Sequence, residues 1–100
     1  MKITRTKIKD LIIIEPNIYE DERGYFIESF NKKKYDELNI NTDFAQDNES
    51  KSTKGVLRGL HFQKPPYDQS KLVRCIQGKV LDVAVDIRTN SKTYGQHFSL

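Results

Sequence analysis

Alternating hydrophobic and polar positions predict short β-strands along most of the chain. Residues 1–8 alternate, and residues 11–14 form a short aliphatic run that Pro16 and Asn17 close, so we expect two opening strands. A turn at 21–24 leads into a third strand over 25–30, which is rich in aromatic residues. Asn31 stands where it would cap a short helix over 32–38, and the pattern predicts no other helix.

The strand pattern continues in the second half of the chain. After a polar stretch at 39–43, strands are expected over 44–50 and 56–63, with a turn at 53–55 between them. Pro65 and Pro66 must leave any ladder, because two successive prolines lack the amide donors of a strand. Segments 71–77 and 79–87 are then predicted to form a hairpin around Gly78.

Between residues 81 and 87 the odd-numbered positions are aliphatic and the even-numbered positions are Asp or Ala. This period of two predicts that the aliphatic face belongs to the core. Many short strands without the spacing of βαβ units indicate an antiparallel sandwich or barrel, organised as a single domain over 1–100. Residues 96–100 begin another strand pattern, and we expect an unpaired edge there, as in a fragment or a chain with an obligate partner.

The charge pattern argues against a nucleic-acid-binding protein. The net charge of +3 comes from interleaved Lys, Arg, Asp and Glu, and the one dense basic run, 32–34, is expected to be a solvated helix face. An anionic small ligand, or no charged ligand, fits better. Cys75 is the single cysteine, which excludes an intrachain disulfide, and no apolar stretch is long enough for a signal peptide or a membrane span. The cytoplasm is the expected location.

The densest group of chemically useful side chains contains Arg58, His61 and Lys71. A neutral histidine can remove a proton from a carbon beside a ketone, while Lys or Arg stabilises the enolate oxygen that develops. A lone histidine in a strand is nevertheless more often a packed or surface side chain. Arg58 and His61 are three residues apart, so a regular strand would send them to opposite faces. An irregularity at Gly59, such as a bulge, would let both face one pocket.

Metal chemistry is disfavoured by the histidine content. His61 and His97 are the only histidines, and neither has a carboxylate or a second histidine at a familiar ligand spacing. We therefore expect no metal site.

Several motifs, in order, resemble the dTDP-4-dehydrorhamnose 3,5-epimerase family. The clearest is Gly-Val-Leu-Arg-Gly-Leu-His-Phe-Gln at 55–63, followed by Pro65-Pro66. The others are Asp-Glu-Arg-Gly-Tyr-Phe at 21–26 with Glu28, Gln-Asp-Asn at 46–48 with Ser50, Gln-Ser-Lys-Leu-Val-Arg at 69–74 and Leu-Asp-Val-Ala-Val-Asp-Ile-Arg at 81–88. The resemblance covers nearly the whole chain.

This resemblance implies an all-β, cupin-type jelly-roll barrel with one short helix, incomplete at the C-terminus, and a homodimer. The implied reaction inverts C3 and C5 of dTDP-4-dehydro-6-deoxy-D-glucose, a dTDP-linked 4-keto sugar, in dTDP-L-rhamnose biosynthesis, without a cofactor. No nucleic acid and no membrane are implied as partners.

Residue roles follow from the same resemblance. The implied catalytic residues are His61 as the base, Lys71 at the enolate and, more weakly, Asp82, which could equally be an exposed polar residue. The implied substrate-binding residues are Arg23, Phe26, Glu28, Gln46, Asp47, Asn48, Arg58 and Lys71. Family members extend beyond Leu100, where they place a tyrosine proton donor, an aspartate that orients the histidine, and a second histidine.

Two other functions remain open at this point. The chain could belong to a related mono-epimerase or isomerase of another dTDP-4-keto sugar. It could also be a non-catalytic nucleotide-sugar binding module. Exchange of the substrate C3 or C5 proton with deuterated solvent separates an enzyme from a binding module.

Overall fold

The computed structural model describes residues 1–40 and 42–100; residue 41, part of the polar stretch 39–43, lies outside the described residues. The chain divides into two compact units. The first comprises residues 1–31 and 75–100, and the second comprises residues 32–74. The single domain expected over 1–100 stays a prediction.

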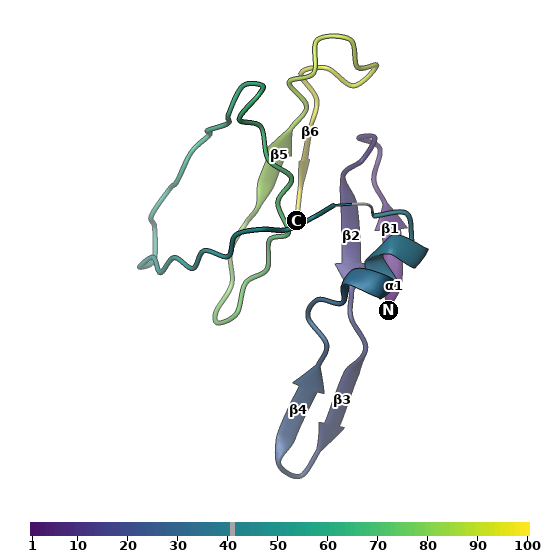
Figure 1. The fold of residues 1–100 in the computed structure, drawn as a ribbon. Helices are drawn as coiled ribbons and strands as arrows, with labels where there is room; N and C mark the ends of the chain where they lie inside the picture. The colour runs from purple at the N-terminus through teal and green to yellow at the C-terminus, as the bar shows by residue number, and fades with distance from the viewer. Residues whose placement is uncertain (41) are drawn as a thin grey trace. The chain divides into compact units, whose positions relative to one another are not determined.

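The first unit opens with an antiparallel pair, β1 (Lys2–Arg5) and β2 (Ile12–Glu15) (Figure 1). Arg5 lies opposite Ile12 in this pair. The Thr6 amide donates to the Leu11 carbonyl at 3.2 Å, so residues 6–11 form the connection. The two predicted opening strands are confirmed. β1 is shorter than expected because the end of the alternating segment 1–8 belongs to this turn, whereas β2 is shifted by one residue from the predicted run 11–14.

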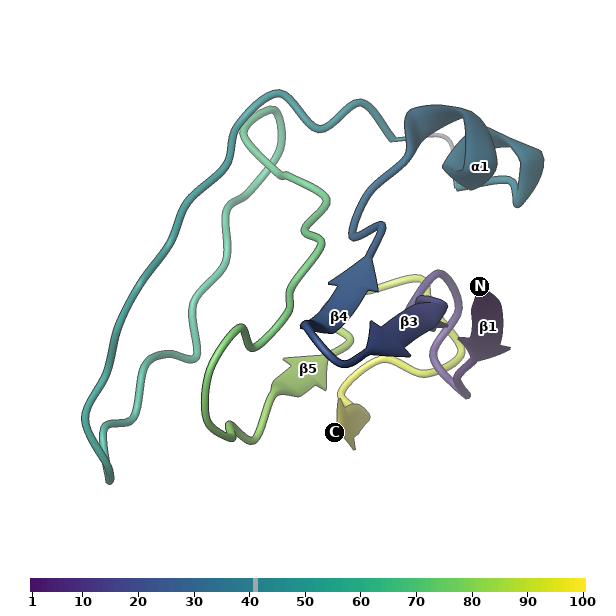
Figure 2. The same ribbon diagram turned by 90° about the horizontal axis from the view of Figure 1, so that it is seen from below.

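A second hairpin consists of β3 (Ile18–Asp21) and β4 (Gly24–Ile27), the neighbouring arrows seen from below in Figure 2. The predicted turn and the strand after it are confirmed, although β4 ends at Ile27. The sequence analysis missed β3, because Pro16 was taken to end the strand region. Pro16 precedes β3 and therefore removes no donor from its ladder. Gly24 has a φ of 125°, which favours glycine at this turn.

The third pair joins β5 (Val83–Val85) to β6 (His97–Ser99), with Val83 opposite Ser99. Asp82 and Leu100 extend it by exchanging backbone hydrogen bonds at 2.9 and 3.0 Å. The strand pattern predicted over 96–100 is thus confirmed by β6. The predicted hairpin around Gly78 is wrong, because the backbone groups of 82–86 pair with residues 95–100 and segment 71–77 is not a strand.

The prediction for the faces of segment 81–87 is also wrong. Asp86, expected opposite the core, is 4% exposed, whereas Leu81 and Ile87 are 75% and 47% exposed. Burial of Asp86 is tolerated because side chains around it satisfy its carboxylate with hydrogen bonds. The aliphatic side chains at the two ends of the segment are left uncovered by the described residues.

The second unit begins with α1 (Lys32–Glu37), which confirms the predicted helix to within one residue. Lys32 pairs with Asp36 one turn later, and Tyr35 is buried. Burial raises the pKa of the Tyr35 hydroxyl. The run of lysines at 32–34 is exposed, as expected of a solvated helix face.

No strand is assigned in residues 42–74, so the strands predicted over 44–50 and 56–63 are wrong for this structure. Backbone hydrogen bonds from this part of the chain close local turns, such as Val56 to Thr53 at 3.3 Å and Tyr67 to Lys64 at 2.9 Å. Those turns confirm the breaks predicted at 53–55 and at the proline pair. An alternating pattern becomes a strand only where another strand accepts its backbone hydrogen bonds, and the trace between α1 and β5 carries no arrow in Figure 1.

Burial of apolar side chains is limited in the described residues. Ile8 and Tyr35 are buried, while large apolar side chains such as Leu57, Leu60 and Phe62 are 89%, 76% and 64% exposed. None of the helices among the described residues is long and apolar enough to cross a membrane.

Candidate functional site

The three predicted catalytic side chains are all exposed. His61 and Lys71 belong to the second unit, and Asp82 belongs to the first, directly before β5. Within residues 1–40 and 42–100, none of the three side chains forms a hydrogen bond or an ion pair. The structure therefore presents a free imidazole and a free ammonium group in the second unit.

Gly59 shapes the backbone beside His61. Its φ of 102° lies in the left-handed region, where a side chain would be strained. A Cβ atom added at Gly59 would lie 3.3 Å from Nδ1 of His61 and 3.4 Å from its backbone nitrogen. The irregularity expected at Gly59 is present, although it is not a bulge because the segment is not a strand. Glycine here leaves room for the imidazole.

Arg58 is held by the segment that precedes it in sequence. Its Nε donates to Oγ of Ser52 at 2.8 Å, and its Nη2 donates to the carbonyl of Lys51 at 3.1 Å. These bonds fix one edge of the guanidinium and leave Nη1 available for an anionic group.

The predicted substrate-binding stretch 46–48 also lies in the second unit. Nε2 of Gln46 donates to Oδ1 of Asn48 at 3.3 Å. Asp47 between them is exposed and makes no side-chain bond with any residue in the described ranges. Amide and carboxylate groups are therefore presented together over three successive residues.

The β3–β4 hairpin brings two predicted nucleotide-binding residues into one depression, which is lined by Tyr19, Glu20, Asp21, Arg23, Gly24, Tyr25 and Phe26. Phe26 contacts the ring of Tyr19, with centroids 6.4 Å apart and planes tilted by 40°. Nε of Arg23 donates to Oδ2 of Asp21 at 3.1 Å. Hydrogen bonds from Arg23 lower the pKa of Asp21, and the same pairing raises the pKa of Arg23. The depression combines aromatic faces with a cation.

Glu28, the remaining predicted contact, follows β4. Its Oε1 accepts a hydrogen bond from Nδ2 of Asn31 at 2.7 Å. This hydrogen bond helps to position the Glu28 carboxylate, whose oxygens are acceptors.

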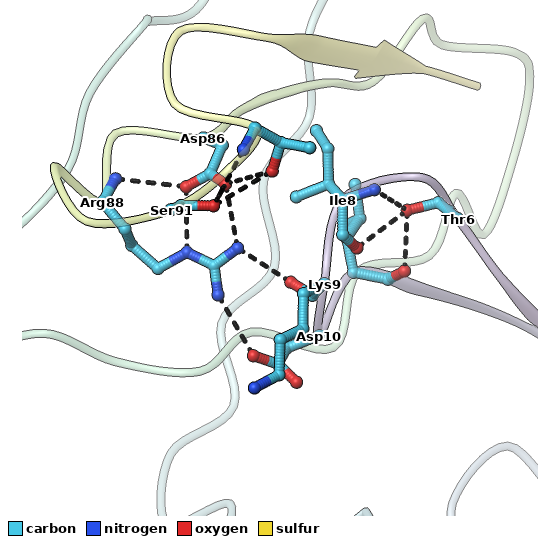
Figure 3. Close-up of polar contacts among 9 residues, drawn as sticks. Thr6, Ile8, Lys9, Asp10, Asp86, Arg88 and Ser91 are labelled. Carbon is cyan, nitrogen blue, oxygen red and sulfur yellow. Dashed lines mark hydrogen bonds and ion pairs between the residues drawn. The ribbon is translucent and has the colours of Figure 1, made fainter.

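A polar cluster around Asp86 was not identified as a site by the sequence analysis (Figure 3). Oγ of Ser91 and Oγ1 of Thr93 both donate to Oδ2 of Asp86, each at 2.6 Å. Arg88 donates to both carboxylate oxygens of Asp86, and it also reaches Oδ2 of Asp10 at 3.1 Å and the carbonyl of Lys9 at 2.9 Å. The cluster ties the β1–β2 turn to the loop after β5.

Electrostatics follow from this geometry. Hydrogen bonds from Arg88, and then from Ser91 and Thr93, hold the pKa of Asp86 far below its usual range. Pairing with Asp86 raises the pKa of Arg88 in turn. The signal in the sequence was Asp86 followed by Arg88, Ser91 and Thr93. It was not recognised because the alternating pattern of 81–87 had assigned Asp86 to the solvent face. Within 1–40 and 42–100, no three His, Cys, Asp or Glu side chains gather closely enough to hold a metal ion.

Known proteins that are similar to this chain are carbohydrate epimerases. The chain belongs to the dTDP-4-dehydrorhamnose 3,5-epimerase family, whose model matches residues 5–100. This confirms the family predicted from the motifs.

Individual relatives agree with this assignment. The dTDP-4-dehydrorhamnose 3,5-epimerase of Shigella flexneri is 57% identical over 97 residues, which cover 96% of this chain and 54% of that protein. The enzyme of the same name from Escherichia coli K12 is 53% identical, with 96% and 52% covered. The chain thus spans about half the length of the curated relatives it matches.

Solved structures give the same result. The dTDP-4-dehydrorhamnose 3,5-epimerase of Elizabethkingia anophelis NUHP1 matches with a TM-score of 0.91 and 54% identity, over 100% of this chain and 55% of that one. The dTDP-6-deoxy-D-glucose-3,5-epimerase of Legionella pneumophila Philadelphia 1 matches with a TM-score of 0.93 and 55% identity, over 99% and 53% of the two chains. That structure is a complex with dTDP-4-keto-L-rhamnose.

Proposed function

We propose that the protein is an epimerase that inverts C3 and C5 of dTDP-4-dehydro-6-deoxy-D-glucose, giving dTDP-4-dehydro-L-rhamnose for dTDP-L-rhamnose biosynthesis. The observation that carries the proposal is the structure of the Legionella enzyme in complex with dTDP-4-keto-L-rhamnose. The protein in that complex is 55% identical to this chain and matches it with a TM-score of 0.93. Family membership over residues 5–100 supports the same activity.

In the proposed mechanism His61 is the base. The C4 ketone acidifies the hydrogens on C3 and C5, because the electron pair left by each proton is delocalised onto the ketone oxygen. His61 removes the proton, and the ammonium of Lys71 stabilises the resulting enolate. Return of a proton to the opposite face of the same carbon inverts the centre. Substrate and product have the same oxidation state, so the reaction requires no redox cofactor.

The local geometry of His61 supports this role. Its side chain is exposed and has no hydrogen-bond partner among the described residues, so a substrate carbon can approach either nitrogen. The absence of a Cβ at Gly59 leaves the space at Nδ1 open. Asp82 is proposed as an accessory carboxylate.

The nucleotide part of the substrate is assigned to the remaining predicted residues. Arg23 and Arg58 are proposed to bind the diphosphate, since each is a guanidinium with further donors, and Phe26 is proposed to contact the base. Glu28 and residues 46–48 are proposed to bind the base or sugar through their amide and carboxylate oxygens. A cupin-type jelly-roll barrel, a homodimer and a cytoplasmic location are parts of the same proposal.

The test is incorporation of deuterium from solvent into the C3 and C5 positions of dTDP-4-dehydro-6-deoxy-D-glucose, followed by proton NMR. We expect exchange by the purified protein and its loss in His61→Asn, with dTDP affinity retained. His97→Asn is the matched control, because His97 is the other histidine and is also exposed.

The outcomes separate the competing functions. Exchange that survives His61→Asn would refute His61 as the base. Nucleotide binding without any exchange would favour a binding module, and exchange at only one of the two carbons would favour a mono-epimerase.

A further inference from the structure

A basic depression lies in the first unit, between the β1–β2 turn and the loop after β5. It has a volume of about 610 Å³. Its lining residues are Lys7, Lys9, Arg88, Asn90, Ser91, Lys92 and Thr93. None of them belongs to the set assigned to the epimerase reaction, and every lining side chain is polar or cationic.

Charge is not balanced in this depression. The acidic groups nearby, Asp10 and Asp86, are both engaged by Arg88. The ammonium groups of Lys7, Lys9 and Lys92 form no ion pair with any residue in the described ranges. Four cations, Arg88 and the three lysines, face two carboxylates, and this excess of positive charge around one concave surface attracts anions.

The two walls of the depression are fixed against each other. Nη2 of Arg88 donates to the carbonyl of Lys9 at 2.9 Å, which joins the loop after β5 to the β1–β2 turn (Figure 3). Oγ1 of Thr6 donates to the Leu11 carbonyl at 2.9 Å and accepts from the amide of Ile8, which is 5% exposed. The turn is therefore anchored from inside, and the lysines are presented from a preorganised backbone.

The chemistry of the lining specifies the kind of anion. No aromatic or aliphatic side chain lines the depression, so a nucleoside base has nothing to stack on. The hydroxyls of Ser91 and Thr93 direct their protons to Asp86, which leaves the lysine ammonium groups and the Asn90 amide as the principal donors. Point charges with rotatable donors suit a compact tetrahedral oxyanion.

We propose that this depression is a binding site for a small oxyanion of the phosphate class, separate from the nucleotide-sugar site. The anion bridges the lysines of the turn and Lys92 of the loop. Binding weakens as ionic strength rises, because the lysines are exposed.

The probe for the test is inorganic phosphate, titrated at low ionic strength into protein that is saturated with dTDP, so that phosphate does not occupy the nucleotide site. Backbone amide NMR signals report both affinity and position. We expect shifts at residues 7–9 and 88–93, and a loss of affinity of about 10-fold or more in the double variant Lys9→Gln/Lys92→Gln.

The matched control is the double variant Lys54→Gln/Lys64→Gln, which removes the same charge from exposed lysines of the second unit. It should bind phosphate as the parent protein does. Equal weakening in both double variants would reduce the effect to net charge and overturn the site. Absence of shifts at 7–9 and 88–93 at low ionic strength would overturn it as well. Neither result depends on epimerase activity.

Discussion

Arg88 donates two parallel hydrogen bonds to the carboxylate of Asp86, from Nε to Oδ1 at 2.9 Å and from Nη2 to Oδ2 at 2.9 Å. The Asp86 side chain is 1% exposed, whereas that of Arg88 is 46% exposed. The cation thus closes the cluster from the solvent side while the anion lies inside it. Because Arg88 also bonds to Lys9 and Asp10, the pair connects segments that are almost eighty residues apart in sequence.

Replacement of Asp86 by Asn should destabilise the protein. The amide cannot accept all four side-chain hydrogen bonds that the carboxylate receives, and Arg88 loses one of its two counter-ions. We expect a fall in the melting temperature of roughly 5 °C or more, measured by circular dichroism. Asp68→Asn is the control, since Asp68 is exposed and forms no side-chain bond with the described residues. Equal melting temperatures in the two variants would contradict a structural role for the cluster.

The same pair predicts how stability changes in acid. The pKa of Asp86 is lower in the folded protein than in the unfolded chain, so the unfolded state binds the proton more readily. This carboxylate therefore stabilises the fold fully above about pH 4 and progressively less as the pH falls below that value. Urea unfolding between pH 7 and pH 2 should show a steeper acid loss in the parent than in Asp86→Asn. Parallel curves would refute the shift.

Local sequence signals predicted local structure well. The helix after Asn31, the turn after Asp21 and the break at Pro65 are all present, because each depends on residues within a few positions of one another. Sequence patterns could not supply the partner of a strand. Alternation predicted that 79–87 would pair with the preceding segment, yet β5 pairs with β6, which follows a loop of eleven residues (86–96).

The sequence also predicted some parts of the site correctly and others wrongly. The residues around His61 were recognised by their resemblance to a family. An irregularity was expected at Gly59, and the backbone there has a positive φ, but the bulge that was expected is not present. Asp86 was predicted on the wrong face, because the alternating pattern assigns aliphatic side chains to the core and polar side chains to solvent. Hydrogen bonds from Ser91 and Thr93, which lie outside the strand, make its burial favourable.

Gly59→Ala should reduce activity through His61. A methyl group at this position would lie 3.3 Å from Nδ1, and alanine is strained at a φ of 102°. Gly55→Ala is a close control, because Gly55 also has a positive φ, of 84°, but nothing lies within 4 Å of its added Cβ. We expect both variants to lose about 1–2 kcal/mol of stability from backbone strain. Only Gly59→Ala should also slow solvent deuterium exchange, by at least ~10-fold.

A similar slowing in Gly55→Ala would assign the effect to backbone strain instead of the imidazole. The two rates should therefore be compared at a temperature where both variants are folded. If exchange by Gly59→Ala equals that of the parent, the space beside Nδ1 has no catalytic importance.

Arg23→Ala should weaken nucleotide binding with little effect on stability. Arg23 and Asp21 are paired at an exposed turn, where an ion pair contributes little to folding. The guanidinium lies in the same depression as the rings of Tyr19 and Phe26, so its removal leaves a site for the base without a cation for the diphosphate. We expect dTDP affinity, measured by isothermal titration calorimetry, to fall about 10-fold or more, while thymidine, which has no phosphate, binds equally to both proteins. Arg5→Ala, on exposed β1, is the charge-matched control and should retain dTDP affinity.

A second variant tests the role of the Arg23–Asp21 pair. If the proposed diphosphate site requires Arg23 to leave Asp21, Asp21→Asn should bind dTDP at least as tightly as the parent. Weaker binding by Asp21→Asn would mean that the ion pair positions Arg23 for the nucleotide instead of competing with it.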